Sequence, residues 1–421
     1  MSGKIVIAVI VLLSILAPWS FAQAPNEPLI AAPVELPPFI GEFHLGGRRF
    51  EWGIEARAEA EYNSNVWEFS DAQENRFDMN LAVNQANGRY RDMDDKDDVI
   101  IFIEAEPYIR FQDNAEREYR VAPIFRYSQF TQNEERNFFE FAFDARQSRG
   151  KGWRNRAYFQ FSPNVFRKNY LATVTDFMGT VSAAERVYMP ADYDQWSIEL
   201  SHRRLLWSPL GAEGKIFDTD LIAPIDDLFG QVYIEFKQRE FDAPFGNRDF
   251  DAIEGGIAII VDMHEGQEFE AGYSLAVRDS PNNTEVLILD EPTFGFDFNG
   301  DMDTTDLNTG TIQKVDRSKL VHTIYMVFSC EPRPDCQVWI GGEYRLHDYQ
   351  SSERFDINHN DRTDHEFSFE VGGDVTIDPN ARLRGVFEFI TRDRHGTGLI
   401  NTNESGDYDV VVVSLAIIVE Q

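Results

Sequence analysis

The chain has 421 residues and a formal net charge of −33, from 39 basic and 72 acidic side chains. Phosphate binding needs a basic surface, so this charge argues against nucleic acid as a partner. A soluble all-β domain usually stops near about 250 residues, whereas a β-barrel grows by adding hairpins, so the length favours a barrel if strands are found.

Segment 1–22 has the pattern of a secretory signal peptide. Lys4 provides the basic start, residues 5–16 are apolar, and small residues precede a cleavage point after Ala22. The apolar run is shorter than a membrane-spanning helix, and Pro18 follows it. We therefore expect the chain to leave the cytoplasm.

Residues 23–45 are rich in proline, which cannot donate to a strand ladder. We expect this segment to be a periplasmic linker without regular pairing. The remainder, 46–421, is expected to form one domain.

The strand pattern is clearest in residues 98–111, where apolar and polar side chains alternate. One face carries Val99, Ile101, Ile103, Ala105, Ile109 and Phe111. The other face carries Glu104, Glu106, Tyr108 and Arg110, although Ile100 and Phe102 break the alternation at its start. A strand this long exceeds the usual length of about five or six residues and matches the roughly 9–11 residues that cross a bilayer.

The same alternation recurs along the chain and predicts an all-β fold, a transmembrane antiparallel up-and-down β-barrel. We expect about fourteen strands, an even number as in bacterial barrels: 49–62, 98–111, 117–130, 136–147, 153–162, 194–206, 229–241, 250–263, 267–278, 318–330, 336–349, 364–377, 381–392 and 408–420. Segments 76–84, 169–177 and 215–222 are further strand candidates, which would raise the number to sixteen. A soluble β-sandwich also alternates and is the competing fold.

The lengths of the connectors support the barrel. The longest ones, 63–97, 163–193, 279–317 and 393–407, fall on one side if the first strand runs outward. The exception is 207–228, which should be a short periplasmic turn.

Two features of the connectors suggest ligands or cross-links. Asp297, Asn299, Asp301 and Asp303 place oxygens at alternate positions and form a weak calcium candidate; no other cofactor is expected. Solubility of an exposed loop explains the same acidic residues, and we favour it over cation binding. Cys330 and Cys336 bracket a short turn, and an oxidising compartment favours a disulfide between them.

The polar faces of the strands identify residues expected to line the lumen: Arg120, Arg126, Arg154, Arg156, Arg203, Glu235, Arg239, Glu343, Arg345, Glu370, Arg382 and Arg384. Unpaired charge is costly to bury, so these side chains must pair or remain hydrated. Two interpretations are open: structural salt bridges that fill the lumen, or a wet channel that selects solutes by charge.

An enzymatic function has weaker support. His359 and His365 lie near Asp356, Asp361 and Asp364, a grouping that could bind a metal or support catalysis. A solvated loop explains the same residues, so we expect no catalytic residue and no enzyme.

The segment Tyr62-Asn63-Ser64-Asn65-Val66 resembles a first-strand phrase, Tyr-x-x-Asn-Val. This phrase occurs in bacterial outer-membrane β-barrels associated with surface-polysaccharide export and surface-protein delivery. The resemblance implies insertion by the barrel assembly machinery and contact with periplasmic export partners.

Together these patterns predict a porin-like barrel in the Gram-negative outer membrane, surrounded by lipid and lipopolysaccharide. We expect transport or export of a polar solute or polysaccharide. The alternatives are a structural or adhesive surface protein with a plugged lumen and, with less support, an outer-membrane hydrolase.

Overall fold

The structure is a computed structural model. It describes residues 41–45, 48–69, 74, 77, 93–113, 116–172, 187–208, 225–242, 248–263, 266–280, 283–287, 311–351, 359, 361–396 and 407–420. The predicted signal peptide, most of the predicted linker and the calcium candidate Asp297, Asn299, Asp301 and Asp303 lie outside these residues.

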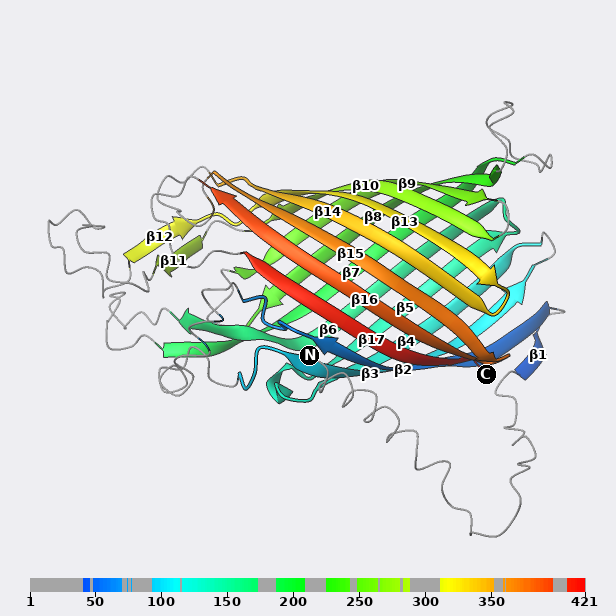
Figure 1. Cartoon of the computed structure of the whole chain (residues 1–421), viewed down its shortest axis with the longest axis horizontal. Helices are drawn as coiled ribbons and strands as arrows, with labels where there is room; N and C mark the ends of the chain where they lie inside the picture. The colour runs from blue at the N-terminus through cyan, green and yellow to red at the C-terminus, as the bar shows by residue number, and fades with distance from the viewer. Residues whose placement is uncertain are drawn as a thin grey trace, which may run out of the picture.

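Fourteen antiparallel strands form a closed barrel, in which each pairs with its neighbours and β2 pairs with both β3 and β17 (Figure 1). The strands are β2 (Arg48–Asn63), β3 (Asp98–Gln112), β4 (Glu118–Phe130), β5 (Phe138–Arg149), β6 (Trp153–Ala172), β7 (Val187–Trp207), β8 (Ile225–Phe241), β9 (Phe250–Met263), β10 (Gln267–Asp279), β13 (Lys319–Arg333), β14 (Cys336–Tyr349), β15 (Arg362–Asp378), β16 (Ala381–Gly396) and β17 (Tyr408–Glu420). Their order confirms the predicted barrel and all fourteen predicted strands.

β6 and β7 extend well beyond the predicted segments, to 20 and 21 residues. The register of this pair shifts between Ser162 and Val165 and again between Phe166 and Lys168. Each shift breaks the alternation of side chains, which hid the continuation of the strand from sequence analysis. The start of the candidate strand 169–177 is therefore the end of β6.

Among the described residues, three short strands lie outside the barrel wall. β11 (Asn283–Leu287) pairs with β12 (Thr311–Val315) inside the long connector 279–317. β1 (Gly41–Leu45) pairs with the start of β2, within the segment predicted to be an unpaired linker. This pairing has a physical cause: β17 pairs with β2 only from Glu55 onward, so β1 occupies the edge that β17 leaves free.

The two ends of the barrel differ in their connections. β1 and the end of β17 lie at one end of the molecule, which we call the periplasmic end, and β11 and β12 lie at the other, the outer end (Figure 1). Short turns such as 150–152 and 379–380 join strands at the periplasmic end. The long connector predicted at 207–228 is shortened to 208–224, because β7 and β8 are longer than expected.

The outer face of the barrel is an apolar belt. Large apolar side chains are exposed at alternate strand positions, among them Ile103, Phe143, Leu200, Ile257, Met326 and Phe367. Ile257 is 61% exposed, an arrangement that is unfavourable in water and natural in a bilayer. No helix among the described residues is long and apolar enough to span a membrane.

Cys330 and Cys336 are free thiols in the structure, so the predicted disulfide is not formed. Cys330 stands opposite Val338, and Cys336 stands opposite Arg333. The two cysteines are thus diagonal across β13 and β14 rather than directly paired. The register of the two strands also shifts between Cys330 and Arg333, at the turn between the two cysteines.

Candidate functional site

The lumen is the candidate site, and its wall is built by the strand positions that face away from the apolar belt. The structure places all of the residues predicted to line the lumen at these inner positions: Arg120, Arg126, Arg154, Arg156, Arg203, Glu235, Arg239, Glu343, Arg345, Glu370, Arg382 and Arg384. The side chains that surround these residues differ between two regions of the wall, one on β3 to β6 and the other on β8 to β15.

One region, on β3 to β6, contains a row of four arginines. Arg110, Arg120, Arg146 and Arg156 stand directly opposite one another on successive strands. Like charges in opposite positions destabilise a sheet unless other groups compensate them. We call these four residues the arginine row.

Carboxylates set between the arginines supply the compensation. Asp144 is 1% exposed; it accepts hydrogen bonds from Arg146, and its Oδ1 lies 3.1 Å from Arg156 Nε. Glu106 Oε1 is 2.5 Å from Arg120 Nη1. These bonds hold the guanidinium groups against the wall.

Glu104 and Glu140, on the strands on either side of Arg126, compensate its charge in the same way. Arg126 Nε lies 2.7 Å from Glu104 Oε2, and the guanidinium also binds Glu140. The carboxylates on this side of the lumen are therefore largely occupied by arginine.

Arg154 and Arg203 form a separate opposite pair near the periplasmic end. Arg154 is exposed and makes no ion pair with the described residues. Arg203 Nη2 lies 3.8 Å from Asp262 Oδ1 and 3.9 Å from Glu268 Oε2. Arg203 does not face Glu235: the register pairs Arg203 with Gln231.

The second region, on β8 to β15, carries aromatic rings that lie over glycines. Tyr233, Tyr325 and Trp339 stand opposite Gly256, Gly272 and Gly372 on neighbouring strands. A Cβ atom at Gly256 would be 2.2 Å from the ring of Tyr233. The glycines therefore allow each ring to lie against the wall.

Each of these rings also donates a hydrogen bond to a glutamate two residues before its glycine. Tyr233 Oη lies 2.6 Å from Glu254, Tyr325 Oη lies 2.7 Å from Glu270, and Trp339 Nε1 binds Glu370. Glu-x-Gly on one strand with an aromatic residue on the next is thus a repeated unit. Sequence analysis missed it, because the signal requires knowledge of the register.

Glutamates stand opposite one another in this second region and on the strands that flank it, β7 and β16. Glu199, Glu235 and Glu254 face each other on successive strands, and Glu370 faces Glu388. The wall thus changes from an arginine row to acidic positions between β6 and β7.

The first outer connector packs onto the inner face of the arginine side at its outer end. Trp67 and its neighbours form an apolar cluster with inward residues of β3, β4 and β6: Val66, Trp67, Phe69, Phe77, Met93, Ile100, Phe130 and Phe166. Ile100 and Phe102, which break the alternation of β3, are explained by this contact. The described residues of the connector are therefore held against the inner face of β3 to β6.

Polar anchors hold this connector in place. Asn65 closes a turn through Nδ2 to Phe69 O at 2.8 Å, and Trp67 Nε1 donates to Asp95 O at 2.9 Å. Asp98 is fully buried and accepts hydrogen bonds from the backbone and side chain of Asn133. The segment that carried the sequence resemblance is therefore the anchor of the first connector.

The inner charges retain access to solvent. The side chains of Arg345, Arg382 and Arg146 keep 45%, 43% and 40% of their exposure. A lumen filled by packed salt bridges would bury such groups. The wall is therefore lined rather than filled by its ion pairs.

The histidines predicted as an alternative site lie apart. His365 is on the outer face, where its Nδ1 is 2.6 Å from Tyr344 Oη, whereas His359 is buried against Tyr349. Asp364 lies on the inner face, bound to Arg362. Within the described ranges, no group of three or more His, Cys, Asp or Glu side chains could hold a metal ion.

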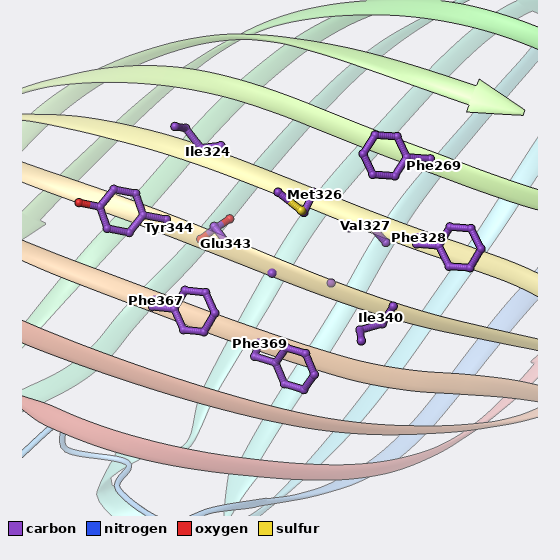
Figure 2. Close-up of a pocket in the computed structure, with 12 residues that line it drawn as sticks. Phe269, Ile324, Met326, Val327, Phe328, Ile340, Glu343, Tyr344, Phe367 and Phe369 are labelled. Carbon is purple, nitrogen blue, oxygen red and sulfur yellow. The ribbon is translucent and has the colours of Figure 1, made fainter. Parts of the chain in front are cut away.

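A groove of about 390 Å³ lies on the apolar belt over β10, β13, β14 and β15. Ile324, Met326, Ile340 and Phe369 line it (Figure 2), as does Gly342 of β14. Glu343 belongs to the inner face of the same strand. The groove therefore faces the lipid and is not part of a solute path.

No protein-family model and no curated protein sequence matches this chain. A bacterial polysaccharide outer membrane secretin aligns with TM-score 0.39 and 7% identity, over 87% of this chain and 97% of its own. OmpT of Vibrio cholerae aligns with TM-score 0.35 and 7% identity, over 90% and 100%. An anion-selective porin from Comamonas acidovorans aligns with TM-score 0.33 and 8% identity, over 88% and 98%.

Strand pairing and the apolar belt establish the class of this protein. The wall is closed, every barrel strand has two partners, and the outer face is apolar. These are the properties of a β-barrel that spans a bilayer. The protein is therefore a membrane-spanning β-barrel.

Proposed function

We propose that the barrel is a channel that lets polar solutes cross the outer membrane through a hydrated lumen. One observation carries this proposal: ion pairs fix the inner charges along the wall while leaving them exposed, as for Arg345 and Arg382. Charged groups at a pore wall select solutes by sign and by hydrogen bonding.

Saccharides are the polar solutes that the second region of the wall fits best. Tyr233, Tyr325 and Trp339 are partly exposed, and each ring turns one face to a glycine. The opposite face of such a ring is a surface on which the apolar face of a sugar can stack. Polysaccharide export is the extended form of the same proposal.

The test is the single-channel conductance of the refolded protein in planar bilayers. A hydrated lumen gives discrete conductance steps that scale with salt concentration. A folded protein that inserts without conducting would show a plugged lumen and favour the structural or adhesive alternative.

We also propose that the barrel performs transport without catalysis. The separation of His359 from His365 supports this, because His359 in the connector packs against Tyr349, whereas His365 on β15 contacts Tyr344 on the outer face. Hydrolysis of a lipid or peptide substrate that disappears in His359→Ala would contradict it.

A further inference from the structure

A row of polar side chains lies on the outward face of the barrel near its periplasmic end. Four successive strands contribute one residue each, directly opposite the next: Tyr119 on β4, Gln147 on β5, Asn155 on β6 and His202 on β7. Leu200, two residues from His202 on the same face of β7, is exposed and belongs to the apolar belt. We call the four residues the polar row.

Hydrogen bonds link the polar row from one strand to the next. Gln147 Nε2 donates to Tyr119 Oη at 2.9 Å, and Asn155 Nδ2 donates to Gln147 Oε1 at 3.2 Å. Asn155 Oδ1 lies 2.7 Å from His202 Nδ1, and because an amide oxygen can only accept, this ring nitrogen carries a proton. Polar groups on the outer face of a barrel are costly at the bilayer centre and tolerated near its surface. The row therefore marks the depth at which the apolar belt ends on this side.

Two arginines flank a tryptophan one position nearer the end of the wall. Arg149 on β5, Trp153 on β6 and Arg204 on β7 stand directly opposite one another, on the same outward face as the polar row. Both arginines are exposed and Trp153 is partly exposed. Tryptophan is enriched where the bilayer meets water. We call these three residues and the polar row together the periplasmic patch.

The charges of Arg149 and Arg204 are not compensated by the chain. Neither side chain makes an ion pair with a described residue. The acids of the nearby turns are bound by other cations: Asp113 by Arg117 Nη2 at 2.7 Å, and Asp227 by Lys151 Nζ at 3.0 Å. The patch is therefore positive on a chain whose net charge is −33.

Other described strands lack this chemistry at the same end of the barrel. Ile109 on β3 and Val375 and Ile377 on β15 are exposed apolar residues on the outward face there. General anchoring of a barrel at the bilayer surface would not confine cations to one side. The confinement of the patch to β4 to β7 points to recognition of a particular lipid.

We propose that the periplasmic patch binds the headgroup of an anionic phospholipid, whose acyl chains lie on the adjacent apolar belt. A guanidinium group binds phosphate oxygens through paired N–H groups. Two strand spacings separate Arg149 from Arg204, about 10 Å, so their long side chains can approach one phosphate from either side of Trp153.

The wall beside the polar row leaves room for the acyl chains. Ala145 and Ala157 stand opposite each other on the outward face, two residues from Gln147 and Asn155. Their small side chains let a hydrocarbon chain lie close to the strands. This inference goes beyond the proposed function, because it concerns the lipid around the barrel and does not require an open lumen.

The test is native mass spectrometry of the refolded protein in neutral detergent, with phosphatidylglycerol and phosphatidylcholine of the same acyl chains in equal amounts. Phosphatidylcholine carries the same phosphate, but its choline cation cancels the charge. Phosphatidylglycerol should be retained in preference by about tenfold or more, since each arginine near an anionic headgroup contributes about fivefold. Equal retention of the two lipids would overturn the inference.

Variants on the two faces of the same strands locate the site. Arg149→Gln with Arg204→Gln should lower the preference about tenfold or more, Arg204→Gln alone about fivefold, and the two lysine variants should retain most of it. Arg154→Gln with Arg203→Gln is the matched control, because it removes the same charge from inward positions on β6 and β7. It should keep the lipid preference whatever its effect on conductance. An equal loss in this control would show a response to net charge alone and contradict the site.

Glycerol 1-phosphate separates a lipid from a soluble phosphate. It carries the charged headgroup without acyl chains, so it should not displace phosphatidylglycerol at equal concentration. Displacement would show that the patch binds a soluble oxyanion and would contradict lipid binding. A heat-dependent shift on gels reports the folding of every variant.

Discussion

The two regions of the inner wall hold their polar groups in different ways. On β3 to β6, buried carboxylates such as Asp144 hold the arginine row by direct ion pairs. On β8 to β15, glutamates are held by aromatic hydroxyl and indole donors whose rings rest on glycines. The first region depends on charge balance, whereas the second depends on space at a glycine.

Removing one carboxylate from the first region should cause the largest loss of unfolding free energy. Asp144→Ala leaves Arg146 and Arg156 unpaired beside each other, and we expect a loss of about 3–5 kcal/mol in unfolding free energy. Urea unfolding followed by gel mobility measures it. Asp335→Ala removes an exposed acid at a turn and should change stability by less than about 0.5 kcal/mol. Equal losses in the two variants would refute the difference.

Adding one methyl group should disturb the second region. In Gly256→Ala the new Cβ meets the Tyr233 ring at 2.2 Å, and we expect a cost of about 1–3 kcal/mol as the ring lifts from the wall. Gly255 faces the other side, and its Cβ would be 3.9 Å from Tyr233 O, so Gly255→Ala is the control.

A double variant shows whether the Tyr233 ring causes the loss of stability in Gly256→Ala. Combining Gly256→Ala with Tyr233→Ala should cost less than the sum of the single changes, because the clash is removed together with the ring. Strict additivity in urea unfolding would show that Gly256 matters for another reason.

Arg154 separates the effect of charge from the effect of ion pairing, because it lies on the inner face but outside the arginine row. Arg154→Glu should shift ion selectivity toward cations and change stability by about 0.5 kcal/mol or less. The same change at Arg156 should destabilise the barrel, because Arg156 is bound to Asp144. Reversal potentials under a salt gradient, measured beside unfolding, check both. Unchanged selectivity in folded Arg154→Glu would count against the channel.

The smallest effect is expected at the cysteines. Replacing Cys330 and Cys336 together by Ser should alter unfolding free energy by no more than about 0.5 kcal/mol. Thiol titration of protein denatured without reductant should find both thiols free. A titration that finds none would show that β13 and β14 adopt a different register at this turn.

Sequence reasoning reached the fold because a period of two survives along most strands. Val99 to Phe111 alone carries enough alternation to predict a strand and its two faces. It placed the charged residues on one face for the same reason. It failed where alternation is interrupted, as at the register shifts after Ser162 and Phe166.

The candidate site was harder to predict from the sequence than the fold was, because its features depend on which residues stand opposite one another. Nothing in the sequence pairs Lys319 with Arg278, or Tyr233 with Gly256, since a shift of one residue would change every partner. The prediction of a disulfide between Cys330 and Cys336 was wrong for this reason. The departure of Ile100 from its pattern was a usable signal for the cluster formed by the first connector.

The closure of the barrel has a consequence for the order of its assembly. β2 pairs with β17 along Glu55–Asn63. Ser64 extends this seam by two hydrogen bonds: its backbone N–H donates to Val411 O at 3.0 Å, and its Oγ accepts from the backbone N–H of Val411 at 2.8 Å. Partners at the seam are separated by most of the chain, and such contacts form slowly. The wall therefore remains an open sheet with two unpaired edges until its last strand arrives, and the latch at Ser64 can engage only in the final step.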